Sequence, residues 1–213
     1  MKKQAILALC ACLLLTFLCA GCVTVVQKGH EAELTGAKTF NAAEDVEAIW
    51  ESKAVPDLTE NAVDLKQLLT EANGQLKSVA GKYGHYSMGD KGELSYIVKG
   101  EGTITEVDTQ KKSGTATLKV AGYDGPIAIK LQIGPVYKGT AVRDCLSFIN
   151  YNDYTNQVDW AKVSQAVHET IDKDVVKKLD LANAQGKNID FVGCFTVSSD
   201  KEIAITPVTV NIK

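Results

Sequence analysis

The stretch that organises the rest of the chain is Leu131–Val163, LQIGPVYKGTAVRDCLSFINYNDYTNQVDWAKV. It starts in strand-like alternation, turns at Gly134-Pro135 and ends in the helical spacing that begins near Trp160. It also holds Arg143, the only arginine of the chain, and the densest run of amide, acidic and aromatic side chains. The stretch therefore predicts a strand-to-helix connection that carries the chemistry of the protein.

Five predicted strands flank this connection. A bend or bulge is expected in the first of them, which is interrupted by Gly100 and Gly102. Three strands precede the helix and two follow it: 94–107, 115–120, 127–133, 189–197 and 202–212. This is the order of an oligonucleotide/oligosaccharide-binding (OB) barrel, with its helix between strands 3 and 4. We expect an α+β protein with a five-stranded OB-like β-barrel over residues 85–213; a partly open sheet packed on a helix has the same order.

Residues 41–84 are predicted to form a small helical subdomain. Asn41 followed by Glu44 is a capping pair, and Pro56 is expected to end the first helix. Apolar residues from 58 to 72 step by 4, 3, 4 and 3 and predict a second helix, which ends before Gly74. A third, short helix is expected from 76 to 83.

The N-terminus resembles an export signal. Lys2 and Lys3 precede the apolar run 5–18, and Ala20-Gly21-Cys22 follows it, as in a bacterial lipobox. We expect a lipoprotein signal peptide over residues 1–21, acylation of Cys22, and a lipidated tether over residues 22–40. The alternative is an uncleaved membrane anchor. Either alternative places the folded part outside the cytoplasm. In the first, a lipid anchors it to the cell membrane, on the periplasmic side or the outer face.

Composition and cysteine usage exclude some classes of function. The formal net charge is −3 and the pI about 5.7, so nucleic acid is not an expected partner. Once the signal is removed and Cys22 acylated, Cys145 and Cys194 remain. In an exported protein they could form one disulfide, or they could be two small buried side chains.

Arg143 has two interpretations. Arginine is a planar cation with several fixed hydrogen-bond donors, and this chain uses it once where it otherwise uses lysine. Such a side chain suits recognition of a carboxylate, a phosphate or vicinal hydroxyls. The structural alternative is an ion pair with Asp144 or Asp153 that fixes the loop before the helix.

Amide, acidic and aromatic residues follow Arg143. Hydrogen-bonding amides beside ring faces are typical of a carbohydrate site, whereas the same residue types before a helix also serve as caps. The candidate ligand-binding residues are Arg143, Asp144, Asn150, Asn152, Asp153, Asn156 and Gln157.

No catalytic or metal-binding pattern is present in the sequence. The histidines, His30, His85 and His168, are scattered and lack metal-ligand spacing. A nucleophile elbow, a phosphate loop and a dinucleotide fingerprint are also missing. We therefore expect a protein that is not an enzyme and that uses no metal or cofactor; an unrecognised hydrolase is the remaining alternative.

Several short motifs carry a resemblance to a known family. They are the lipobox, Ile49-Trp50-Glu51 with Val55-Pro56, Asn61–Leu65, Lys82-Tyr83-Gly84, Gln132–Val136, Gly139–Asp144, Thr155–Val158, Gly186-Lys187 and Ile205–Val208. Together these motifs resemble the predicted periplasmic lipoproteins grouped as domain of unknown function 2291.

The resemblance implies a helical part joined to a barrel-like part, and genes that lie beside sugar-type ABC transporters. It also implies small residues where this chain has Cys145 and Cys194, so a disulfide between them is a plausible feature of this member. The sequence therefore suggests an accessory of a sugar-type uptake system that binds a small polar, sugar-like ligand or the transporter proteins. The alternative is an envelope interaction protein without a small-molecule ligand.

Overall fold

The fold is built around β3 (Lys91–Asp108), a strand that pairs with two long strands in succession. Its first part pairs antiparallel with β6 (Asn188–Thr196) and its last part with β4 (Ser113–Val120). Gly102 lies at the change of partner, and a Cβ there would be 2.8 Å from the carbonyl oxygen of Lys119. The glycine lets the neighbouring strand approach closely. The irregularity expected in this strand lies just beyond it, where the register with β4 shifts between Ile104 and Glu106.

The strand pairings run in a closed circuit. β5 (Ala128–Pro135) pairs antiparallel with β4 and parallel with β7 (Glu202–Ile212), and β7 pairs with β6, which returns to β3. The expected order of these five strands is therefore observed. The expected number of strands was wrong, because the described residues form a seven-stranded sheet. The two additional strands, β1 (Val63–Asp64) and β2 (His85–Met88), are short and pair with β3.

The structure is a computed structural model that describes residues 40–89 and 91–213. The predicted signal peptide, Cys22 and nearly all of the predicted tether lie outside the described residues. Residues Asn41–Lys213 form one compact unit with a continuous apolar core. Helix gives way to strand at Gly84, between α6 (Ala80–Tyr83) and β2. In the described part of the chain, no helix is long and apolar enough to span a bilayer.

The helices before the sheet differ from the expected ones at two points. Asn41 caps α3 (Ala42–Ile49) through hydrogen bonds from the amides of residues 43 and 44, as expected. Pro56 does not end a helix: a π-helical turn, η1 (Trp50–Ala54), leads directly into α4 (Val55–Asn61). Proline lies in the first turn of α4, the part of a helix that tolerates it best.

The predicted helix from 58 to 72 is divided in two. Between α4 and α5 (Leu65–Ala72) the chain is extended and pairs as β1 with β3. The apolar spacing continues through the break because both helices bury leucines in the same core, including Leu58, Leu65 and Leu69. A short 3-10 turn, η2 (Leu76–Val79), and α6 then complete this region.

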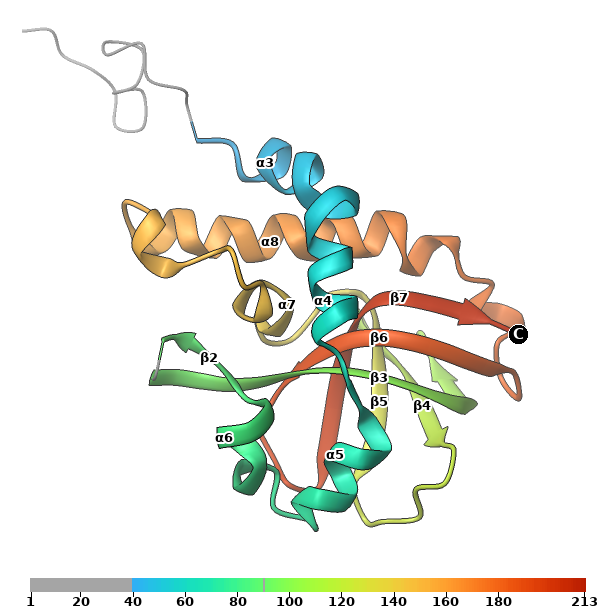
Figure 1. The fold of residues 1–213 in the computed structure, drawn as a ribbon. Helices are drawn as coiled ribbons and strands as arrows, with labels where there is room; N and C mark the ends of the chain where they lie inside the picture. The colour runs from blue at the N-terminus through green and yellow to red at the C-terminus, as the bar shows by residue number, and fades with distance from the viewer. Residues whose placement is uncertain (1–39, 90) are drawn as a thin grey trace, which may run out of the picture. The chain divides into compact units, whose positions relative to one another are not determined.

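The connection from β5 to β6 holds most of the expected chemistry. It contains α7 (Ala141–Cys145), the 3-10 turn η3 (Tyr151–Asp153) and the long helix α8 (Gln157–Asp174), followed by η4 (Val176–Lys178) and η5 (Leu181–Asn183). Figure 1 shows α8 lying across one end of the sheet, with α3 beside it and α7 between α8 and the strands. The buried face of α8 includes Trp160, Val163 and Val167, so this helix closes the end of the core.

Candidate functional site

Arg143 is held inside the protein. It is only 5% exposed, and its Nε and Nη2 atoms donate hydrogen bonds of 2.8 and 2.6 Å to Oδ1 of Asp144. The Asp144 side chain is fully buried, and its other oxygen accepts a hydrogen bond from the hydroxyl of Thr140. The guanidinium is thus occupied by an internal ion pair, which corresponds to the structural alternative considered for this residue.

The same guanidinium fixes Trp160 on α8. Its Nη1 donates to the backbone carbonyl of Trp160 at 3.0 Å, and its Cζ lies 3.9 Å from the centroid of a Trp160 ring. Cation–π contact and hydrogen bond together hold α7 against α8. The rings of Tyr151 and Tyr154 pack on Trp160 with centroid distances of 5.8 and 5.1 Å. Arg143 therefore orients an aromatic cluster.

A groove of about 450 Å³ lies beside this cluster. One wall is the edge strand β2, with its flanking Gly84 and Gly89, and the other is the segment from Leu146 to Asn152; Asp144 and Trp160 also line it. We call it the η3 groove. It brings together three of the predicted site residues, Asp144, Asn150 and Asn152, with aromatic residues from separate parts of the chain, Tyr86, Tyr151 and Trp160.

Two contacts shape the walls of the η3 groove. Asp57 of α4 accepts hydrogen bonds from the amide and the hydroxyl of Ser147, at 3.0 and 2.8 Å, which fixes the segment after α7. His85 on the opposite wall is half-buried, and burial lowers the pKa of its imidazole while the nearby Asp57 carboxylate opposes the effect. Lowering the pKa favours the neutral imidazole, which can both donate and accept a hydrogen bond.

The other predicted residues act as local caps. Asn156 caps α8: its Oδ1 accepts from the amide of Asp159 at 2.9 Å and its Nδ2 donates to the Asp159 carboxylate. Asp153 accepts from the amide of Asn150 at 3.3 Å and closes η3. Gln157 is the exposed first residue of α8. None of the three lines the η3 groove.

Cys145 and Cys194 are neighbours in the core. Both are free thiols and almost completely buried, one on α7 and the other on β6. Burial raises the pKa of the Cys145 thiol, and its hydrogen bond with Cys194 acts in the same direction. The structure thus brings together the two cysteines that the sequence suggested as a pair, and the disulfide stays a prediction.

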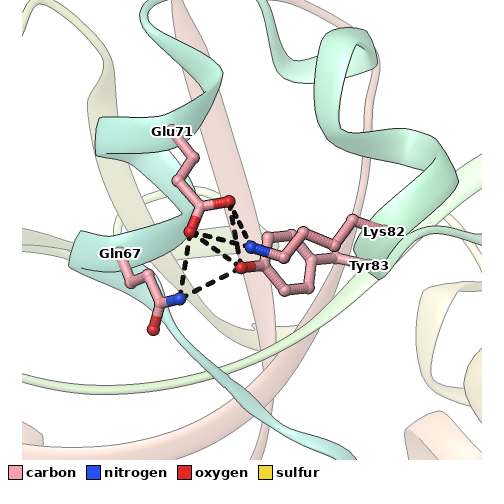
Figure 2. Close-up of polar contacts among 4 residues, drawn as sticks. All are labelled: Gln67, Glu71, Lys82 and Tyr83. Carbon is pink, nitrogen blue, oxygen red and sulfur yellow. Dashed lines mark hydrogen bonds and ion pairs between the residues drawn. The ribbon is translucent and has the colours of Figure 1, made fainter.

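In a second polar cluster, on α5 and α6, the side chains hydrogen-bond to one another. Figure 2 shows Glu71 surrounded by Gln67, Lys82 and Tyr83. Its carboxylate accepts from Lys82 at 2.8 and 3.1 Å, from Tyr83 at 2.9 and 3.0 Å and from Gln67 at 3.0 Å. These hydrogen bonds, those from Lys82 above all, lower the pKa of Glu71 to about 2. With its oxygens already occupied, this carboxylate is suited to joining α5 to α6.

Residues 40–89 and 91–213 contain no group of three or more His, Cys, Asp and Glu side chains arranged to hold a metal ion. The polar and aromatic groups that line the η3 groove are amides, hydroxyls, the His85 imidazole, one buried carboxylate and aromatic rings. Sequence reasoning missed the β2 wall, because its strand is short and its four residues alternate only twice. The alternation His85-Tyr86-Ser87-Met88 before a glycine was the available signal.

Comparisons with known proteins agree with this fold. A crystal structure of an OB-fold protein from Thermotoga maritima is similar, with a TM-score of 0.64 and 17% sequence identity, over 83% of this chain and all of that chain. At this identity the likeness concerns the fold, and it confirms the mixed α+β, OB-like architecture. No curated protein matches the sequence.

The family profile described as predicted periplasmic lipoprotein matches residues 12–211, nearly the whole chain. This match confirms both the resemblance drawn from the short motifs and the expected location outside the cytoplasm. The chain therefore belongs to the DUF2291 family of predicted periplasmic lipoproteins.

Proposed function

We propose that this periplasmic lipoprotein binds a small hydroxyl-rich ligand in the η3 groove and serves as a non-catalytic accessory of a sugar-type uptake system. The observation that supports binding is the meeting of amide and aromatic groups in one groove. Asn150 and Asn152 offer donors and acceptors for hydroxyls, and Tyr86 and Tyr151 offer ring faces or edges for apolar C–H groups. The link to uptake rests on the family resemblance.

The volume of the groove fits a small ligand. Ligand sites in proteins usually measure about 300–1,000 Å³, and the η3 groove measures about 450 Å³. Its walls are also fixed in advance, by the hydrogen bonds between Asp57 and Ser147 and by Arg143 behind Trp160. Fixed walls favour binding because less conformational entropy is lost when the ligand enters.

The proposal is tested by unfolding the full-length chain in mild detergent, with and without pentoses, hexoses, sugar acids and nucleosides. A ligand at about 100 times its dissociation constant adds roughly 2.7 kcal/mol to the free energy of unfolding. For a protein of this size the midpoint should rise by about 5–10 °C. Trp160 supplies a second readout: with Trp50 replaced by phenylalanine, the remaining tryptophan emission reports on the groove.

Two groove variants and one control make the test specific. Asn152→Ala and Tyr151→Ala should abolish the shift; Asn152→Ala should keep the midpoint of the free protein, whereas Tyr151→Ala should lower it because the ring contact with Trp160 is lost. Asn183→Ala removes an amide of the same kind from η5, outside the groove, and should leave the shift intact. If no compound shifts the midpoint, or if all three variants respond alike, the η3 groove is not a small-ligand site.

The alternative, an envelope interaction protein without a small ligand, is favoured by two observations. Arg143 is closed inside its ion pair, and two large apolar side chains at the groove, Tyr86 and Met88, are 38% and 48% exposed. Exposed apolar groups on an edge strand are typical of protein contacts. Cross-linking in intact cells distinguishes the two functions, because Met88→Lys should remove a protein partner and spare a sugar-dependent shift.

A further inference from the structure

A second polar hollow lies on the outer face of three adjacent strands, away from the η3 groove. It measures about 410 Å³, and alternate residues of β4, β5 and β7 form its floor: Ser113, Thr115, Lys130, Gln132, Glu202 and Ala204. Strand residues two apart share a face. The intervening residues Leu131 and Ile203 are buried in the core. We call this hollow the β5 cleft.

Gln132 holds the rim of the β5 cleft in place. Although polar, it is only 3% exposed, and its Oε1 accepts from the amide of Lys138 at 2.7 Å. Its Nε2 donates to the carbonyl of the same residue at 3.1 Å and to the hydroxyl of Thr206 at 2.8 Å. The Gln132 side chain thus binds both the N–H and the C=O of Lys138, and Gly139 follows with a positive φ of 78°. The result is a lysine presented at a fixed point of the rim.

The charges lining the cleft balance in number, but two of them have no ion-pair partner in the described part of the chain. Its cations are Lys111, Lys130 and Lys138, and its anions are Glu93, Asp108 and Glu202. Lys130 pairs with Glu202 at 2.6 Å, and Lys111 with Asp108 at 3.7 Å. Neither Lys138 nor Glu93 forms an ion pair with any residue in the ranges 40–89 and 91–213. One ammonium and one carboxylate are therefore left available in the same cleft.

We propose that the β5 cleft binds a small zwitterion, with its carboxylate on Lys138 and its ammonium on Glu93. Hydroxyls of Ser113, Thr115, Thr196 and Ser198 also line the cleft and can hydrogen-bond polar groups of the ligand. No aromatic side chain of the described residues lines the cleft, which disfavours ligands recognised by ring stacking, such as nucleobases. A molecule with a single charge would leave either Lys138 or Glu93 unmatched, so the cleft should discriminate against it.

Isothermal titration of the full-length protein in detergent tests this assignment. The zwitterionic probes are glycine, L-serine and γ-aminobutyrate, which differ in the separation of their charges. Lactate, ethanolamine and erythritol are the anionic, cationic and neutral comparisons. At least one zwitterion should bind. Each of the three comparison compounds should bind at least roughly tenfold more weakly, because lactate and ethanolamine each lose one charged hydrogen bond and erythritol loses both.

Variants then locate the site. Lys138→Ala and Glu93→Gln should each weaken zwitterion binding by about tenfold. Lys119→Ala removes an exposed lysine of β4 outside the cleft, and Asn152→Ala alters the η3 groove; both should leave the affinity unchanged. Circular dichroism checks that each variant is folded. The proposal is overturned if no zwitterion binds up to about 10 mM, if erythritol binds equally well, or if Lys138→Ala and Glu93→Gln retain full affinity.

Discussion

Removing the Arg143 guanidinium should destabilise the fold strongly. In Arg143→Ala the Asp144 carboxylate stays fully buried, loses both hydrogen bonds from the guanidinium and keeps the one from Thr140. The carbonyl of Trp160 loses a donor as well. Breaking a buried ion pair by removing one partner costs about 3–5 kcal/mol, because the remaining charge is left uncompensated. For a chain of this length the unfolding midpoint should fall by roughly 6–20 °C.

A double-mutant cycle separates the ion pair from simple loss of packing. Arg143→Met combined with Asp144→Asn removes both charges, so it should cost less than the sum of the two single changes. Urea unfolding followed by far-ultraviolet circular dichroism measures all four proteins without relying on Trp160 emission. Lys119→Ala serves as a surface control and should stay within about 0.5 kcal/mol of the parent. A loss below about 1 kcal/mol for Arg143→Ala, or strictly additive costs in the cycle, would refute the account of a closed, buried pair.

Three further predictions concern other parts of the core. Burial lowers the pKa of His168 below its ordinary value of 6.5 in the folded protein. The unfolded chain therefore binds a proton on this imidazole more tightly than the folded protein does, and the free energy of unfolding should fall as the pH drops below about 6.5. His168→Gln should flatten that decline in pH-dependent unfolding, and an unchanged slope would contradict it. A Cβ on Gly193 would lie 2.6 Å from two atoms of β7, so Gly193→Ala should be destabilising by about 1–3 kcal/mol, whereas Gly81→Ala meets no atom within 4 Å and should be neutral or stabilising. Equal denaturation midpoints for the two glycine variants would count against this packing. In the oxidising environment outside the cytoplasm, Cys145 and Cys194 should form a disulfide. The oxidised protein should be two hydrogen atoms lighter by mass spectrometry and about 4 kcal/mol more stable to unfolding than the reduced form. Alkylation of both thiols in unreduced, unfolded protein would exclude the bond.

The order of the main strands could be predicted from the sequence because each strand is an apolar run bounded by turn residues. Only β4 buries strictly alternate residues, whereas β3, β5, β6 and β7 each bury four or five residues in succession. The segment from 202 to 212 matched β7 residue for residue. Short strands are different, since two to four residues give too few alternations to separate strand from loop. β1 illustrates this limit: Val63 and Asp64 lie within helical apolar spacing, and only their pairing with β3 makes them a strand.

The candidate site could be predicted in part. Residue types alone pointed to the segment after Arg143, and the η3 groove does contain Asp144, Asn150 and Asn152. Sequence could not decide between an exposed and a buried arginine, because burial depends on Trp160, which approaches from the next helix. The β5 cleft was missed for a related reason. Its residues come from distant segments, although polar Lys130 and Gln132 inside a predicted strand were a signal of an outward, hydrogen-bonding face.

The two candidate sites share one short segment of chain. Lys138, at the rim of the β5 cleft, is gripped by Gln132, and two residues later Thr140 donates to Asp144 on the floor of the η3 groove. Buried or half-buried hydrogen bonds anchor both ends of this segment. The two anchors have different partners, so a change at one end can leave the other in place. Gln132→Leu separates anchoring from folding: it keeps the volume, removes the grip on Lys138, and should weaken zwitterion binding while leaving the Arg143–Asp144 pair and the sugar-dependent shift intact. If both binding activities disappear together in a folded Gln132→Leu protein, the two sites are one mechanically coupled unit.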